Sequence, residues 1–361
     1  MPVSLRPDHL DFALRLHTGL SGSGFGLVWS PYSVASALGL VAVGARGRTR
    51  EELTGLLGPR PQEQMAALDQ AVADGPEPAT RTGLWVREDL PLRSEFESAV
   101  RARPGSGVYP ADFSGDPDGV RQEINAEIAT ATRGLIGELL QPGTVRASTQ
   151  ALLVNALWVR MRWLREFDSA KTRRRAFHSP AGTRKVPMMR RQARLPYAST
   201  AGWRMATLPG DGELALDVLL PDEPASRTEL TQEALTALYR AASPTEVALS
   251  LPRFELTYGT ELSGALHGAG VRTVFTDQAD LAGISQRRLR IDQIIHRARL
   301  RVDEKGAEGA AATAVVMRTV AAIPGRPVEF TADRPFVFVL RRRAAILFLG
   351  TVADPEDPGP P

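Results

Sequence analysis

Hydrophobic and polar positions alternate along this chain in two different periods, so that helical and extended segments follow each other in mixed order. Apolar residues that recur at helical spacing predict amphipathic or buried helices. The expected helices cover residues 11–20, 29–44, 49–58, 62–74, 93–103, 120–140, 228–241 and 261–269. Strict alternation or a short continuous apolar run predicts strands. The expected strands cover residues 81–87, 152–163, 203–220 (as a hairpin), 246–258, 289–302, 336–340 and 345–350.

This mixture of helices and strands predicts an α+β fold. A chain of 361 residues is long enough for two domains, but no low-complexity linker or internal repeat separates the expected elements. We therefore assign residues 1–352 to one intimately packed domain. Residues 353–361, which read ADPEDPGPP, are expected to form a flexible tail.

Local signals place the ends of two early helices. Ser30 followed by Pro31 suits a helix start, with the serine as the cap. The residues that follow are apolar on all sides, which predicts a helix buried under a sheet. Thr49 and Glu52 have the spacing of a capping box for the next helix, and Gly58 before a proline marks its end.

The stretch from residue 302 to residue 335 combines features of several structures. It opens with charges, passes through small side chains, becomes β-branched and ends among prolines. If its middle part forms a strand, alternate residues lie on opposite faces. The two charged residues, Glu308 and Arg318, then lie on the same face, and the other face is uncharged. That pattern is typical of a strand with one buried face, whereas the alanine content suits a surface helix equally well. A segment compatible with helix, exposed loop and buried strand suits a chain that changes between them.

Composition and charge are those of an ordinary globular protein. Hydrophobic residues make up 43% and charged residues 24% of the chain, and the formal net charge of +3 is dispersed, which argues against nucleic-acid binding. Lys171, Lys185 and Lys305 are the only lysines among 44 basic residues, a bias typical of GC-rich genomes. We therefore expect a bacterial source, and arginine ion-pair networks would suit a warm habitat.

The absence of cysteine excludes disulfides, thiolate metal sites and a cysteine nucleophile. The first residues carry no apolar core of signal-peptide length, and no window reaches the length of a membrane span. We expect a cytoplasmic protein, or a secreted one if a leader has been trimmed.

Motifs for catalysis or metal binding are missing. The chain has five histidines but no nucleophile elbow, zinc-protease motif or phosphate-binding loop, so we expect neither an enzyme nor a cofactor. Asp112, Asp116 and Asp118 lack the glycine and glutamate of a calcium loop and are interpreted as turn residues. The basic residues crowded into 171–194 are interpreted as a solvated rim, the alternative being a docking patch for an acidic partner.

Several separated motifs, in the same order, resemble the serpin family over nearly the whole chain. They are SPYSVASAL from Ser30, INAEIATATRGLIGELL from Ile124, LVNALWVRMRW from Leu153, KVPMM from Lys185, TDQADLAGIS from Thr276, DRPFVFVL from Asp333 and ILFLGTVADP from Ile346. The resemblance implies the serpin fold: a large central β-sheet, two further sheets, packed helices and an exposed reactive-centre loop over about 304–328.

The start of this loop is similar to that of inhibitory serpins, where Glu, a polar residue and Gly precede a hinge of small residues. The matching residues are Glu304, Lys305, Gly306, Ala307, Glu308, Gly309, Ala310, Ala311, Ala312 and Thr313. Ala307 replaces the usual Thr or Ser and Gly309 replaces Ala, but both are small enough to insert into a sheet.

The resemblance also assigns two groups of residues that control sheet opening. Trp163, Arg253 and Glu304 match the breach, where the loop first enters the sheet; many serpins carry Lys where Arg253 stands. Ser30, Ser33, Asn155 and His296 match the shutter beneath the opening point. From the residues alone, His296 on an apolar strand is interpreted as a core residue with hydrogen-bond partners, in preference to a catalyst or ligand.

By resemblance, the chain is an inhibitor that a serine protease attacks as a substrate. Counting from Glu304 as in family inhibitors places the reactive bond at Val320–Ala321, and counting back from Phe330 allows a bond one or two residues later. Valine at the specificity position implies a chymotrypsin-like or elastase-like protease as the partner. We expect a monomer prone to loop–sheet polymerisation. The alternative is a non-inhibitory serpin-fold chaperone or binding protein, with a hydrolase a distant third.

Overall fold

A computed structural model describes residues 5–21, 26–73, 79–103, 105–223, 229–307 and 326–360. These residues form eight α-helices and two β-sheets. The helices are α1 (Pro7–Leu20), α2 (Pro31–Gly44), α3 (Gly47–Leu57), α4 (Pro61–Ala73), α5 (Ser94–Arg101), α6 (Pro117–Ala131), α7 (Gln232–Ala241) and α8 (Ser263–Gly268). The α+β class and the serpin fold expected from the sequence are confirmed.

The first sheet is the central one, and its strands are drawn from distant parts of the chain. They are β2 (Ala79–Arg87), β3 (Ser106–Ala111), β4 (Ala151–Trp158), β5 (Met161–Arg162), β11 (Phe254–Glu261), β12 (Gln293–Val302) and β13 (Gly306–Ala307). The order is β3-β2-β4-β12-β13-β5, with β11 paired to the other side of β12. Every residue of β4 is buried, as the continuous apolar run predicted.

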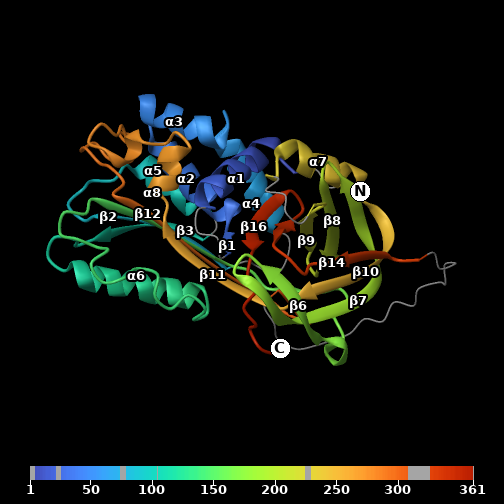
Figure 1. Ribbon diagram of the computed structural model, residues 1–361. Coiled ribbons are helices and arrows are strands. Elements are labelled where there is room, and N and C mark those ends of the chain that lie inside the picture. The colour runs from blue at the N-terminus through green and yellow to red at the C-terminus, as the bar shows by residue number, and fades with distance from the viewer. Residues whose placement is uncertain are drawn as a thin grey trace.

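Helices cover both faces of this central sheet (Figure 1). Helix α2 packs against β4 on one face, in the same hydrophobic cluster as Leu153 and Leu157. Helix α6 lies on the opposite face, where Ile124 and Ile128 share a second cluster with Leu152 and alternate residues of the strands. The two faces of β4 therefore belong to two separate cores.

Two further sheets were expected beside the central one, and the structure joins them into a single second sheet. Among the described residues its strands run β1-β16-β15-β9-β8-β7-β10-β14, with β6 also paired to β7. Their bounds are β1 (Leu27–Trp29), β6 (Arg173–Ser179), β7 (Gly182–Thr200), β8 (Trp203–Pro209), β9 (Leu214–Pro221), β10 (Ser243–Pro252), β14 (Val328–Thr331), β15 (Phe336–Arg342) and β16 (Ala345–Val352). The long strand β7 makes the junction, because its first half pairs with β6 and its last residues pair with β8.

Helix α2 begins as the sequence predicted. The hydroxyl of Ser30 accepts a hydrogen bond from the backbone N–H of Ser33, and Pro31 occupies the first turn. All but one of the residues of α2 are buried, consistent with an apolar surface on all sides.

Two predicted helix features are wrong. Helix α3 begins at Gly47, so Thr49 and Glu52 do not form a capping box; both side chains bind the backbone of residues 272–280 instead, through Asp280 N and Thr273 N. Helix α6 ends at Ala131, well before residue 140, because the chain turns at Arg133 and Gly134 with positive φ values of 54° and 79°.

Within the described residues, no helix combines the length and the apolar content needed to cross a membrane.

Candidate functional site

The central sheet is closed between β4 and β12 along most of their length. The two strands pair in parallel from Gln293 opposite Leu152 to Ala298 opposite Leu157. Beyond this point they separate, and β13 lies between β12 and β5 at the end of the sheet. The candidate site therefore has two parts: a closed region, which contains the shutter, and an open end, which contains the breach.

Hydrogen bonds of His296 tie the closed region to the helix beneath it. Its Nε2 atom accepts a hydrogen bond from the backbone N–H of Ser30 at 3.0 Å. The proton must then be on Nδ1, which donates to Asn155 Oδ1 at 3.2 Å. The Asn155 amide in turn donates to Thr82 Oγ1 at 2.8 Å. This chain of contacts links β2, β4, β12 and the start of α2.

Burial keeps His296 neutral. The side chain is fully buried, and burial lowers its pKa from 6.5 to about 3. Both ring nitrogens are engaged, and the nearby Ser30 hydroxyl already serves as a helix cap. Neither nitrogen is available as a general base, so the arrangement suits a polar lock between strands. Ser33 is also buried here, but its hydroxyl has no hydrogen-bond partner.

The breach is built around the buried carboxylate of Glu304. Arg253 Nε donates to Glu304 Oε1 at 2.8 Å, and the hydroxyl of Thr172 donates to the same oxygen at 2.6 Å. The second oxygen, Oε2, is buried without a hydrogen-bond partner. The ion pair is almost fully withdrawn from solvent, with side-chain exposures of 11% for Arg253 and 2% for Glu304. Removing one partner would leave the other charge buried and uncompensated.

Trp163 holds the backbone turn that carries Glu304. Its indole N–H donates to the carbonyl of Asp303 at 2.8 Å, and its backbone N–H donates to the carbonyl of Lys305 at 3.1 Å. Phe167 N–H donates to the carbonyl of Glu304 at 2.9 Å. The turn is thus fixed by three hydrogen bonds from residues that follow β4.

The first two hinge residues after this turn already occupy a strand position. Ala307 lies opposite Val302 of β12 and opposite Met161 of β5, antiparallel to both. Ala307 is fully buried. Gly306 has no room for a side chain, since an added Cβ would lie 2.0 Å from the carbonyl oxygen of Met161. A glycine is therefore required where the chain enters the sheet.

The C-terminal segment makes contacts next to the breach. Glu356 O accepts a hydrogen bond from Glu255 N at 3.0 Å, and Asp357 Oδ1 lies 3.7 Å from Arg253 Nη1. Pro360 O accepts a hydrogen bond from Arg301 Nη2 at 3.1 Å. These contacts connect the C-terminal segment to Arg253 and to the paired strands β11 and β12.

The structure thus brings together the breach residues, and likewise Ser30, Asn155 and His296 of the shutter. The remaining predicted residues lie outside the described part of the chain: Glu308, Gly309, Ala310, Ala311, Ala312, Thr313, Val320 and Ala321. Sequence reasoning missed Thr172 and Thr82, because a single hydroxyl in a polar stretch carries no signal of its own. It also missed Asp303, which is fully buried beside Glu304 and accepts a hydrogen bond from Lys305 N.

The three aspartates that superficially suggested a calcium loop are used in turns and caps. Asp112 accepts a hydrogen bond from Gly115 N, and Asp116 caps α6 through Gly119 N. Asp118 pairs with Arg121. In the described part of the chain, no group of three or more histidines or acidic residues could hold a metal ion.

Comparison with known proteins gives the same family over the whole length. The profile described as "Serpin (serine protease inhibitor)" matches residues 8–355. Serpin-Z1C of Triticum aestivum is 31% identical and the match covers 95% of this chain and 94% of that protein. The Iris protein of Ixodes ricinus is 31% identical, with coverage of 98% and 100%. The solved structure of uncleaved ovalbumin shares the fold with a TM-score of 0.86 at 24% identity, covering 98% of this chain and 100% of that one.

Proposed function

This chain belongs to the serpin family of serine protease inhibitors, and from that premise we propose that it traps its target as a suicide substrate. In this proposal a protease attacks the reactive-centre loop and forms an acyl-enzyme. The freed loop then adds to the central sheet as a new strand, a form of strand addition for which the serpins are the general example. The supporting observation is the position of β13, whose residues lie between β12 and β5 as the first step of such a strand.

The register of β13 predicts where an inserted strand would lie. Ala307 is opposite Val302 and Met161, and β4 and β12 keep the same mutual offset along their closed region. Continued antiparallel without a bulge, this register places Thr313 between His296 and Asn155. Insertion would therefore separate the two shutter side chains that now contact each other.

The same register decides which loop residues become buried. Residues directly opposite each other in a ladder point to the same face. Ala307 is buried in the core on the α2 side, so residues 309, 311, 313, 315, 317 and 319 would point there too. The charged residues Glu308 and Arg318 would point to the α6 face. The uncharged alternating set thus meets the apolar core.

Insertion has enough free energy to be a driving force. Burial of Val315 and Met317 contributes roughly 2 kcal/mol each. About a dozen ladder hydrogen bonds near 1 kcal/mol each bring the total to the order of 10 kcal/mol. Small residues at 307 and 309–314 allow entry without overpacking the core. We infer that the intact form is metastable and stores this free energy until cleavage.

For the target, we propose a chymotrypsin-like or elastase-like protease that cleaves at Val320–Ala321. An apolar specificity residue fits the primary pockets of these enzymes, and neither Lys nor Arg stands there for a trypsin-like one. The chain's own part would be to present the bond and to move the acylated end, with no catalysis by its side chains.

Mixing the protein with chymotrypsin, pancreatic elastase and trypsin tests this proposal. We expect a complex with chymotrypsin or elastase that survives heating in SDS and has the mass of protease plus cleaved inhibitor. Trypsin serves as the matched control and should give none. Clean cleavage without a complex would instead favour the non-inhibitory alternative, and no cleavage at all would favour a binding role.

A further inference from the structure

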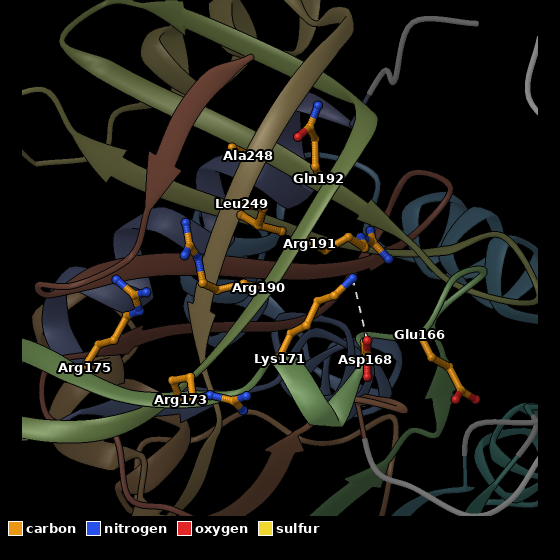
Figure 2. Close-up of a pocket in the computed structure, with 10 residues that line it drawn as sticks. All are labelled: Glu166, Asp168, Lys171, Arg173, Arg175, Arg190, Arg191, Gln192, Ala248 and Leu249. Carbon is orange, nitrogen blue, oxygen red and sulfur yellow. Dashed lines mark ion pairs between the residues drawn. The ribbon is translucent and has the colours of Figure 1, made fainter. Parts of the chain in front are cut away.

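A basic hollow lies on the outer face of the second sheet, over β6, β7 and β10. It encloses about 560 Å³. Five of its lining residues are cationic, and we call this set the basic groove: Lys171, Arg173, Arg175, Arg190 and Arg191. Figure 2 shows Arg173, Arg175 and Arg190 gathered on one side, with Glu166 and Asp168 on the other.

Within the part of the chain that the structure describes, three of the five cations of the basic groove form no ion pair. Among the described residues, Arg173, Arg175 and Arg190 have no ion-pair partner, and all three are exposed. Lys171 Nζ lies 3.6 Å from Asp168 Oδ2, but this pair is open to solvent, with side-chain exposures of 70% and 51%. Exposed pairs of this kind are weak and leave both groups available to a partner.

Arg191 is a partly buried cation of the basic groove. Its guanidinium lies over the ring of Phe167, 4.9 Å from the centroid, and donates to the carbonyl of Arg165. Burial, together with the nearby charge of Arg165, lowers the pKa of Arg191 from 12.5 to about 10. An incoming carboxylate would offset this cost of burial, because an opposite charge nearby favours the charged form of the guanidinium.

The basic groove lies between the two places where the reactive-centre loop is anchored. On one side Lys171 adjoins Thr172, whose hydroxyl binds Glu304 at the breach. On the other side Leu249, which also lines the groove, is paired with Phe330 of β14, just after the loop. A protein that engages the loop therefore comes close to the groove.

The charges of the loop and of the groove favour one kind of partner. The loop sequence from 308 to 326 carries Glu308 against Arg318 and Arg326, so the loop itself is not the complement of a basic groove. A uniform polyanion would be repelled by Glu166 and Asp168 at one end. A folded protein with a local cluster of carboxylates avoids that repulsion, and arginine forks match carboxylates in pairs.

We propose that the basic groove is a second docking site for an acidic surface segment of the target protease. The proposal rests on the inhibitory function proposed above. The groove would act on encounter: complementary charge raises the association rate and favours proteases that carry carboxylates beside their active site. The rate enhancement decreases as salt rises, because surface charges are screened.

The direct test measures binding of a fluorescein-labelled peptide, in which a short run of glutamates is flanked by neutral residues, to the intact protein by anisotropy, at low and physiological salt. The test variant carries Arg175→Glu and Arg190→Glu. If circular dichroism shows that it does not fold, a variant with Arg175→Gln and Arg190→Gln replaces it. The matched control is Arg50→Glu with Arg288→Glu, two exposed arginines far from the groove on α3 and before β12. We expect affinity about tenfold lower in the test variant and nearly unchanged in the control.

Three results would overturn the proposal: no binding of the peptide by the wild type, equal weakening in the test and control variants, or tighter binding of heparin or duplex DNA in competition with the peptide. The last would assign the groove to a polyanion. The SDS-stable complex with chymotrypsin or elastase is scored separately on the same variants. If the test and control variants bind the peptide equally well but still form complexes, only the docking site is refuted. If the wild type forms no complex, the inhibitory function is refuted.

Discussion

Glu304 is a buried carboxylate that receives two hydrogen bonds through one of its oxygens and none through the other. Its partner Arg253 also approaches Asp357 of the C-terminal segment. Such a pair contributes little net stability compared with apolar packing, but its disruption is costly because the remaining charge stays buried. At the scale of single residues, this contact joins the turn that carries Glu304 to the start of β11.

Replacing Glu304 with alanine should therefore lower the barrier to sheet opening. Loss of one partner of a buried ion pair costs about 3–5 kcal/mol, borne by the intact state. We expect latent or polymeric forms to appear on native gels at lower temperature than for the wild type. Glu63→Ala, which removes an exposed ion pair with Arg60, is the control and should behave as wild type. Unchanged gels for the Glu304 variant would count against this role of the breach.

Three histidines are kept in their neutral forms: His9 and His296 are buried, and His17 is partly buried. Burial lowers the pKa values of His9 and His17 to about 4 and that of His296 to about 3. The unfolded chain, with ordinary values near 6.5, binds more protons than the folded chain as the pH falls below that value. Stability is therefore fully present above about pH 6.5 and is lost progressively toward the folded-state pKa values.

At pH 5 each buried histidine should cost about 2 kcal/mol of unfolding free energy relative to pH 7. His296→Gln can keep an acceptor for Ser30 N–H and a donor for Asn155, but it does not titrate. We expect this variant to lose a smaller part of its stability between pH 7 and pH 5, measured as the shift in urea midpoint. His178→Gln, at an exposed position, is the matched control. An equal shift in all three proteins would contradict the assignment.

At the scale of elements, the segments that carry the site were predictable. The apolar run around Asn155 and the alternation around His296 produced β4 and β12, and the all-apolar helix after Ser30 produced α2. Long, consistent patterns of this kind leave few alternatives because each position agrees with its neighbours. The approach of Trp163, Arg253 and Glu304 needed the family resemblance, since no periodicity relates distant strands.

The elements that were missed have physical reasons. The strands β6 and β7 lie where basic residues crowd the sequence, and those side chains point outward while Val186 and Met188 are buried. Because these basic residues were interpreted as a solvated rim, the sequence did not predict the two strands. The contacts of Glu52 with a distant loop were invisible because tertiary partners compete with local capping.

The central sheet also sets a test for the hinge. In the register continued from β13, Ala311 would lie between Ala298 and Leu157. Proline there removes a ladder donor and clashes within a central strand, so insertion should stall after acylation. We expect Ala311→Pro to be cleaved as a substrate, with SDS-stable complex reduced by roughly tenfold or more. Ala311→Ser is the control that keeps the backbone N–H, and full trapping by the proline variant would refute insertion.

At the scale of the whole molecule, the fold is divided between a closed and an opened sheet. The pairing of β4 with β12 closes one part of the sheet, whereas at the breach β13 lies between β12 and β5. Helices pack on opposite faces of the closed part of the sheet, so a strand added there would be buried on both sides (Figure 1). A fold with this arrangement gains stability when its loop is cut, provided that the loop inserts.

Thermal unfolding of the intact and the loop-cleaved protein tests that central claim most directly. The chain is nicked with elastase, the cut near Val320 is verified by mass, and both forms are compared by calorimetry. If the cleaved loop inserts, cleavage raises the melting temperature by several degrees or more, because the insertion free energy is added to the fold. The nicked Ala311→Pro variant should show no such rise. An equal or lower melting temperature for the cleaved wild type would contradict loop insertion, because cutting an ordinary exposed loop does not stabilise the fold.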